Sequence, residues 1–312
     1  MSLQKEIWLP VIENNLFAAW EKLTQLGKDD NNFVVKDASS RYYKVYIPQA
    51  GSMDGVVVNP TSYPLSVSER TDDTLDYSLD HLAMKPIRLG AWDTSLLSYD
   101  KMQSILVDFA GNIGEAQLYK TFVNWYVNGG TAAKRVLTGG ASMGASSAPS
   151  STTNVKKLLL TDIIKGAAIL DKQNIPNDGK RKAILPVDMF YQLHEDMLTG
   201  SYNINIIEKD GLTMLSQPIA GFQIHMFPKV VNVVETTYAV RAFDHVGAAT
   251  DREAGLLFHQ DMVSVAKGDL NVYVNDGDPT MLGDVLSAEA WIGGKYRRKD
   301  TLGVVPIIQA NA

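Results

Sequence analysis

The chain has 312 residues, of which 45% are hydrophobic and 21% charged, so it is long enough to bury one large core or two smaller ones. Its 29 basic and 35 acidic side chains give a formal net charge of −6, which disfavours the tight phosphate binding of a specific nucleic-acid-binding protein. The absence of cysteine excludes disulfides, thiolate zinc sites and a thiol nucleophile.

Targeting and cofactor signals are also missing from the sequence. No stretch approaches the roughly 18 consecutive apolar residues of a membrane span, and the first ten residues lack the basic and apolar run of a secretory signal. We therefore expect a soluble protein made in a cytoplasm, with no membrane partner. No two of the five histidines have the spacing of helical metal ligands and no cofactor motif occurs, so we expect neither metal nor cofactor.

The first half of the chain begins with apolar side chains scattered over residues 1–40, a pattern typical of an arm that lies against another surface. From residue 42 the period changes to two. Tyr43, Val45 and Ile47 alternate with other side chains, and the alternation returns at residues 65–67 and 75–79. No helix pattern follows directly to cover these strands, so the alternation between residues 43 and 79 predicts a protruding β-loop.

Helical periodicity runs from Ser98 to Asn128, with apolar residues at three- and four-residue steps. This pattern predicts one long amphipathic helix, with Ser98 as its N-cap and Gly129 with Gly130 as its end. Gly139 to Thr153 are nearly all Gly, Ala and Ser. Because such a composition has little to bury, we expect a mobile loop there.

The remainder alternates helix and strand patterns, which indicates a mixed sheet flanked by helices. A core helix is predicted at residues 155–174, capped by Thr153 or Asn154, and a short helix at 187–198. Residues 230–254 show no pattern that we assign. Strands are predicted at residues 183–185, 219–226, 256–265, 288–298 and 304–308.

One segment has the form of a catalytic signature. Gly140 to Gly144 spell G-x-S-x-G, the nucleophile elbow of serine hydrolases, with Ser142 as the nucleophile. That chemistry requires a buried strand leading into the serine and a helix leading out of it. Both flanks here are Gly, Ala and Ser, in which chance matches are common, so the sequence favours an ordinary loop over a hydrolase.

Two charged clusters invite a binding interpretation. Asp72, Asp73, Asp76 and Asp80 offer the oxygens of a calcium or magnesium site, although a solvated or partner-facing strand edge is the simpler interpretation. A basic run offers charges for weak, non-specific DNA contact, although a solvated edge or an inter-subunit ion pair explains these charges at least as well. It consists of Lys295, Arg297, Arg298 and Lys299. His259 has no nucleophile tied to it, and we expect a hydrogen-bonded histidine there.

The order of these features resembles the major capsid proteins of tailed bacteriophages, which have the Hong Kong 97-type fold. The resemblance covers nearly the whole chain and implies an α+β fold with an N-terminal arm, an extended β E-loop, a peripheral domain with a long spine helix, and an axial domain. The segments that carry it are Lys5 to Trp8, Glu13 to Phe17, Val45 to Gly51, Arg70 to Asp72, Ser98 to Lys101, Arg181 to Pro186, Ile219 to Ile224 and Phe258 to Val263.

The resemblance also implies boundaries and contacts. The expected parts are the arm at 1–40, the E-loop and flanking strands at 41–90, the spine helix of the peripheral domain at 91–135, the mobile loop at 136–154, and the axial domain with the remaining peripheral strands at 155–312. The expected inter-subunit contacts are Trp8, Phe17, Arg70, Asp72, Asp73, Lys295, Arg297 and Arg298.

A resemblance of this kind implies a non-enzymatic shell protein that assembles through pentamers and hexamers into an icosahedral virion capsid, procapsid first and mature head later, in the bacterial host cytoplasm. The implied partners are the chain itself, a scaffolding protein, a portal and packaged double-stranded DNA held non-specifically. No long charged helical segment precedes the arm, so a separate scaffold or prior removal of that segment is implied, and no residue here suggests a covalent cross-link. An encapsulin-type compartment and, more distantly, a serine hydrolase using Ser142 remain alternatives.

Overall fold

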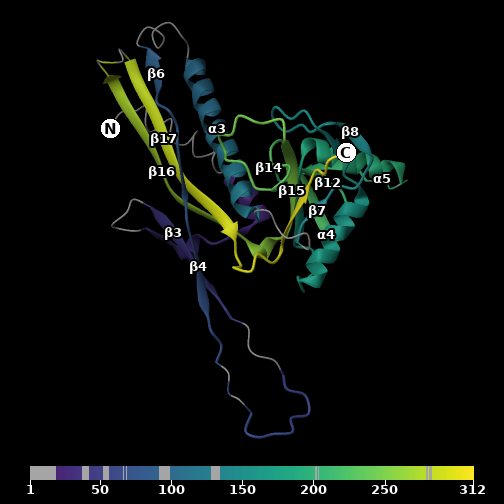
Figure 1. Ribbon diagram of the computed structural model, residues 1–312. Helices are drawn as coiled ribbons and strands as arrows, with labels where there is room; N and C mark the ends of the chain where they lie inside the picture. Colours follow the sequence, from purple (N-terminus) through teal and green to yellow (C-terminus); the bar gives the residue numbers. More distant parts are fainter. Residues whose placement is uncertain are drawn as a thin grey trace.

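The computed structural model describes residues 19–36, 42–51, 56–65, 67, 69–90, 99–127, 134–200, 202, 204–278, 280 and 283–312. It is a mixed structure of helices and sheets from whose body one loop projects far out (Figure 1). Within the described residues, no helix is both long and apolar enough to cross a membrane.

The largest sheet has eight strands. Its order is β11 (Ile206–Lys209), β12 (Leu212–Leu215), β13 (Phe222–Phe227), β10 (Arg181–Pro186), β15 (Asp251–His259), β18 (Val304–Ile308) and β7 (Val136–Leu137), with β14 (Val231–Val234) also paired to β15. Alternate residues of β10 enter different cores: Ala183 and Leu185 join one cluster and Ile184 joins the other. The central strands are therefore apolar on both sides, as expected for strands covered on both faces.

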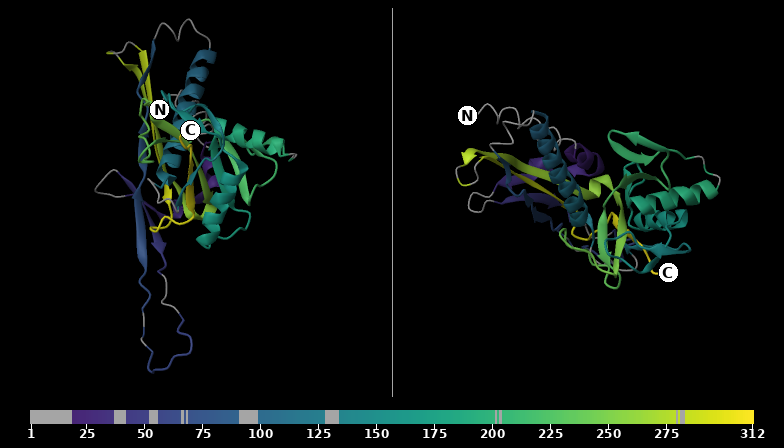
Figure 2. Two further views of the ribbon diagram at one scale, coloured as in Figure 1. Left: turned by 45° about the vertical axis from the view of Figure 1, so that its right-hand side comes forward. Right: turned by 90° about the horizontal axis from the view of Figure 1, so that it is seen from above.

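Helices α4 (Leu160–Lys172) and α5 (Val187–Thr199) cover one face of this sheet. Ile163 and Leu170 of α4 and Phe190 and Leu193 of α5 are fully buried against it. Burying a side chain of this kind stabilises the fold by about 1.5–3 kcal/mol. Both views in Figure 2 place these two helices at the end of the molecule away from the long β16–β17 hairpin.

The second sheet is built around that hairpin. Its order is β1 (Lys28–Asp29), β16 (Val263–Asp278), β17 (Gly283–Tyr296) and β5 (Asp80–Ala83), with β6 (Ile87–Gly90) also paired to β17. Helix α3 (Tyr99–Trp125) runs alongside it (Figure 1). The indole Nε1 of the fully buried Trp125 donates to the carbonyl of Ser264 at 2.9 Å, which joins the end of α3 to the sheet.

Smaller elements complete the described chain. A three-stranded sheet has the order β2 (Val34–Lys36), β3 (Tyr43–Gln49) and β4 (Asp73–Ser78), and β8 (Ser142–Ala145) pairs with β9 (Asn154–Lys156). Residues 19–26 are helical, and the two short 3-10 helices are η1 (Asn31–Phe33) and η3 (Gln260–Met262). Leu23 and Leu26 are fully buried in the core between the two large sheets.

Most strong periodic patterns are confirmed. The predicted long helix is α3, the predicted short helix is α5, and the predicted strands at 183–185 and 304–308 are β10 and β18. The strand predicted at 256–265 is interrupted by η3, and the one predicted at 288–298 is the longer β17. Residues 230–254, left without an assignment, contain β14 and the start of β15. Residues 98, 129 and 130 lie outside the described residues.

Three predictions of local structure are wrong. Residues 139–153 are not a loop without structure, because β8 pairs with β9, and Ser146 Oγ donates to Gln309 at 2.5 Å. The core helix begins at Leu160 and not at residue 155, since 154–156 form β9 and Lys156 N donates to Ala310 O. The described residues 65 and 67 belong to no strand.

Candidate assembly surfaces

The most exposed apolar surface lies on the loop between β3 and β4. Val56, Val58, Tyr63 and Val67 are 93%, 78%, 76% and 94% exposed, and the loop extends well beyond the body of the molecule (Figure 1). Apolar side chains grouped on one exposed segment are typical of a surface that another protein covers. The chain thus presents a long apolar projection that its own described residues leave uncovered.

The base of the projection, in contrast, is firmly held. Tyr43, Val45 and Ile47 of β3 pack with Leu75 and Tyr77 of β4 in a small buried core. This core also contains Ala266 of β16, so it joins the three-stranded sheet to the second large sheet. A rigid base of this kind fixes the direction in which the loop leaves the body.

Polar contacts reinforce this base. The Gln49 amide donates to Arg297 O at 2.5 Å and accepts from Lys299 N at 3.3 Å, which ties β3 to the turn after β17. Arg70 donates to Asp72 at 2.6 Å, and Asp73 pairs with Lys299. Hydrogen bonds from Arg70 and from Lys299 lower the pKa values of the Asp72 and Asp73 carboxyls, respectively. These exposed side chains cluster where the loop begins and ends.

The predicted contact residues of the basic run have partners within the chain. Arg297 forms two hydrogen bonds to Asp30, at 2.9 and 3.1 Å, and that carboxylate is only 1% exposed. Arg298 pairs with Asp300 at 2.6 Å, and Lys295 lies 5.6 Å from the ring centre of Tyr296. Arg297 is thus part of an internal ion pair, whereas Arg298 remains half-exposed.

The other predicted contacts stay predictions. Trp8 and Phe17 lie outside the described residues. Of the acidic cluster, Asp76 is exposed in β4, while Asp80 accepts a hydrogen bond from Asn124 at 2.6 Å and pairs with Lys120 at 3.5 Å. Asp72 and Asp73 each have their own cation, so the four carboxylates do not converge on one ion.

Ser142 does not lie in a nucleophile elbow. It begins the exposed strand β8, which pairs with β9 in a two-stranded sheet. A hydrolase needs this serine on a tight turn between a buried strand and a helix, beside an oxyanion hole. The local structure of residues 139–160 provides neither that strand nor that helix in that order, so it lends the hydrolase interpretation no support.

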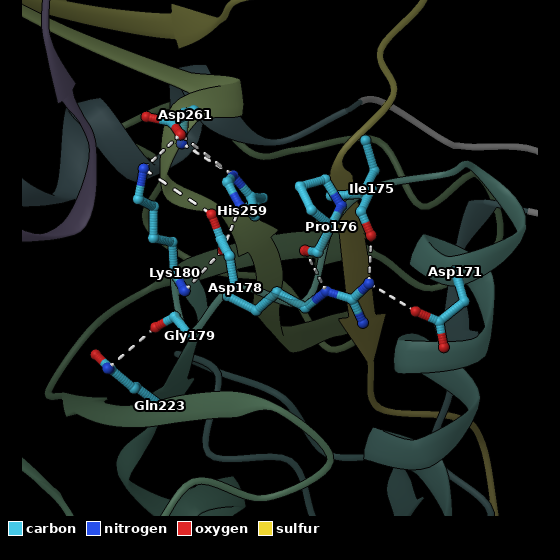
Figure 3. A network of polar contacts seen from close by, with 10 residues as sticks. Asp171, Ile175, Pro176, Asp178, Gly179, Lys180, Gln223, His259 and Asp261 are labelled. Carbon is cyan, nitrogen blue, oxygen red and sulfur yellow. Dashed lines mark hydrogen bonds and ion pairs between the residues drawn. The ribbon is translucent and has the colours of Figure 1, made fainter.

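A polar network that the sequence analysis missed lies at the start of β10 (Figure 3). His259 is 1% exposed, and its Nε2 lies 2.9 Å from Asp178 Oδ1. Its Nδ1 accepts from the backbone N–H of Asp261 at 3.2 Å, so Nε2 carries the proton in the neutral ring and donates to Asp178. This confirms the expectation of a hydrogen-bonded histidine, and the His259 hydrogen bond lowers the pKa of Asp178.

The same three side chains have the composition of a metal site. Ligand atoms of Asp178, His259 and Asp261 lie within 4.8 Å of one another. However, both ring nitrogens are engaged, and the Lys180 ammonium lies 3.1 Å from Asp261 and 3.9 Å from Asp178. Figure 3 shows this ammonium beside both carboxylates, where it supplies the positive charge that an ion would supply. The arrangement fits a structural network better than a metal centre.

Arg181 extends the network into the protein. Its side chain is 1% exposed and donates to Asp171 at 2.6 Å, to Ile175 O at 2.5 Å and to Pro176 O at 3.1 Å. These acceptors lie at the end of α4 and in the segment after it (Figure 3). A buried guanidinium is tolerated when its charge is paired and its N–H groups have acceptors, which the Asp171 carboxylate and the two carbonyls provide. The network therefore fixes α4 relative to β10.

Comparison with known proteins adds the fold family. No protein-family model matches the chain, and no curated protein matches it either. Solved structures do match. A chain of the cyanophage P-SCSP1u capsid has a TM-score of 0.52 at 18% identity, with 86% of this chain and 84% of that chain covered. The capsid of Ralstonia phage GP4 gives 0.54 at 11% identity, with 86% and 84% covered.

One further similar structure is not a phage capsid. The holo-SrpI encapsulin complex from Synechococcus elongatus PCC 7942 has a TM-score of 0.51 at 8% identity, with 78% of each chain covered. The α+β class and the Hong Kong 97-type fold predicted from the sequence are thus confirmed, because the similarity spans most of the chain in each case. The chain has the fold of tailed-phage capsid proteins, which the encapsulin shares.

Proposed function

We propose that the chain is a non-enzymatic shell protein that assembles into the icosahedral capsid, procapsid first and mature head later, of a tailed double-stranded DNA phage or prophage. The observation that carries this proposal is the projecting loop: Val56, Val58 and Val67 are almost fully exposed on a rigid base, within a capsid-type fold. In a closed shell, neighbouring copies would bury this surface, and the modest stabilisation of each contact recurs many times.

Each part of the fold has a proposed counterpart in a capsid subunit. The β3–β4 loop corresponds to the expected E-loop, and α3 with the β16–β17 sheet to the peripheral domain with its spine helix. The eight-stranded sheet with α4 and α5 corresponds to the axial domain, which would meet its copies at the centre of pentamers and hexamers. Tyr191 and Leu198 on α5 and Ile206 and Ile207 on the edge strand β11 are exposed there, as such contacts require.

The remaining partners follow from the shell interpretation and from charge. A net charge of −6 suits a wall that encloses packaged DNA without binding it tightly. Arg297 and Arg298, two cations of the basic run, already bind Asp30 and Asp300. Assembly in the host cytoplasm with a scaffolding protein and a portal completes the proposal.

An encapsulin-type compartment is the second candidate, because the SrpI encapsulin has a similar fold. Purification of assembled particles from the native host separates the two. A DNA-filled particle with a portal supports the phage capsid, whereas an enzyme cargo in particles that lack DNA and portal supports the compartment.

The loop provides the test of assembly. Electron microscopy and size-exclusion chromatography would compare the wild type with Val56→Asp/Val58→Asp, with and without scaffolding protein. We expect capsomers or shells from the wild type and a folded but unassembled subunit from the double variant, because two carboxylates cannot be buried without a partner. Val246→Asp is the matched control, since Val246 is also exposed, at 89%, but lies outside the loop.

Two outcomes would contradict the proposal. One is a wild type that stays monomeric under all conditions, scaffold included. The other is a double variant that assembles as well as the control. Reaction of the chain with a fluorophosphonate, lost in Ser142→Ala, would instead establish the hydrolase alternative.

A further inference from the structure

His225 is an unusual residue for a protein core. It lies in β13 at 4% exposure, and neither ring nitrogen has a hydrogen-bond partner among the described residues. A leucine at this position would be buried without the cost of desolvating two polar nitrogens. A buried histidine without a protein partner therefore requires an explanation.

The charged neighbour of His225 is Lys182 in the adjacent strand β10, to which β13 pairs in parallel. Lys182 is 9% exposed, and its ammonium donates to the carbonyl of Gln25 at the end of helix 19–26. A cation is favourable at a helix C-terminus, where carbonyls lack intrahelical partners. Lys182 thus holds the helix on the sheet, directly beside a histidine that must stay neutral.

Helix 19–26 covers this face of the sheet. Leu23 and Leu26 are fully buried in the same cluster as Ile184 of β10 and Leu212 of β12. The following Gly27 lies against Trp125 and Val265, where a larger residue would collide with both. The helix is therefore packed between the two large sheets, and the polar pair lies beneath it.

No described carboxylate neutralises this pair. Of the charged residues of the helix, Glu21 is exposed and Lys22 lies over Gly211 of the β11–β12 turn. The β11–β12 hairpin carries Glu208, Lys209 and Asp210, all of which are exposed. Met214 of β12 is the residue paired with His225 across the sheet, and it has no charge. A proton on His225 would therefore face Lys182 without a compensating anion.

We propose that His225 and Lys182 form an acid-sensitive lock for helix 19–26, in which protonation of His225 places a second cation beside Lys182 and releases the helix while the sheet stays folded. The lock is a property of the single chain and does not depend on the proposed function. If the chain is a shell protein, release would free a helix that belongs to the predicted arm at residues 1–40.

The direction of the pH dependence follows from linkage. Burial, and then Lys182, lowers the pKa of His225 from 6.5 to about 4. A released helix leaves this histidine near its ordinary pKa, so the released state binds the proton more tightly. The contribution of neutral His225 to the docking of helix 19–26 on the sheet is complete above pH 6.5 and weakens as the pH falls toward 4. At pH 4.5 the ratio of released to docked helix should be about 70-fold higher than at pH 7.5.

Hydrogen–deuterium exchange on the full-length chain tests this inference between pH 7.5 and 4.5, after correction for intrinsic exchange rates. In the wild type we expect amides 23–27 to lose about 70-fold in protection at pH 4.5 while β10 and β15 remain protected. In His225→Leu the protection of the helix should persist at pH 4.5. His81→Leu is the control, because His81 is an exposed histidine of another sheet, and it should respond like the wild type.

A second variant keeps the test decisive if His225→Leu does not fold. Lys182→Met removes the neighbouring cation and the bond to Gln25, so exchange of the helix should be faster at pH 7.5 and depend less on pH. Equal loss of protection in the wild type and His225→Leu would overturn the lock. So would simultaneous loss over β10 and β15, which would indicate global unfolding. Shell assembly is not measured in this experiment, so its result is separate from that of the loop test.

Discussion

Replacement of Arg297 by methionine should destabilise the folded subunit itself, although Arg297 belongs to the basic run expected at subunit contacts. Its partner Asp30 is 1% exposed and accepts two hydrogen bonds from the guanidinium, at 2.9 and 3.1 Å. Methionine fills much of the same volume but leaves the carboxylate buried without a cation. Loss of one partner from a buried pair costs about 3–5 kcal/mol.

The matched control is Arg298→Met. Arg298 and Asp300 form an even closer pair at 2.6 Å, but their side chains are 49% and 43% exposed. An exposed pair of this kind contributes about 0–1 kcal/mol, so the control should unfold almost like the wild type. Urea unfolding of the unassembled subunit, followed by tryptophan fluorescence, measures both free energies of unfolding.

A third variant separates the ion pair from simple loss of packing. Asp30→Leu/Arg297→Met removes both charges and should recover part of the stability lost in the single variant. Equal losses of stability in the Arg297 and Arg298 variants would refute the reasoning. So would a double variant whose loss equals the sum of the losses in Asp30→Leu and Arg297→Met. A folded Arg298→Met that fails to assemble would support Arg298 as an inter-subunit contact.

Three further substitutions test the packing and electrostatics of the fold. Burial raises the pKa of Glu253 to about 7, so the stability that the neutral carboxyl group contributes is intact below pH 4.5 and is lost as the pH rises to 7. In urea titrations, Glu253→Gln should raise the free energy of unfolding by up to about 3 kcal/mol at pH 8 and hardly at all at pH 4.5. Gly255→Ala would place a methyl group 2.7 Å from Leu185 and should lower the free energy of unfolding by about 1–3 kcal/mol; a more stable variant would contradict this. Gly111→Ala in α3 meets open space and should stabilise by about 1 kcal/mol, which thermal unfolding would show.

The long helix, the short helix and several strands could be predicted because their signals are local. Apolar residues at helical spacing in α3 and the apolar run of β10 specify their structure within a few neighbouring residues. The exposed loop could also be predicted, since no following helix pattern was available to cover it. The order of these features carried the resemblance that implied the fold class.

The β8–β9 hairpin could not be predicted, because its stabilising contacts come from distant parts of the chain. Ser146 contacts Gln309, Thr152 N donates to Ala249 O, and Lys156 N donates to Ala310 O. A Gly, Ala and Ser segment has little apolar surface of its own, so composition alone indicates a loop. Tertiary contacts override that local tendency and also take residues 154–156 away from the predicted helix.

The hydrogen bond of His259 could be predicted, but its partner Asp178 and the buried site of His225 could not, for a similar reason. His259 and Asp178 are 81 residues apart in sequence, and they meet because β10 pairs with β15. His225 meets Lys182 through the parallel pairing of β10 with β13. The apolar patterns of these strands predict that they are buried, but they do not specify which polar side chains share a face across the sheet.

The exposed loop and the buried polar sites have opposite consequences for where stability resides. The His259 network and the Arg297–Asp30 pair are complete within one chain, so the subunit should fold before it meets another copy. Folding of the subunit gives no burial energy to Val56, Val58 and Val67, because these side chains remain exposed. Their burial is available only to an assembly, and each copy that binds the loop stabilises the bound state by mass action. A shell built this way should therefore unfold at higher temperature than its free subunits, with the loop the first segment to gain protection on assembly.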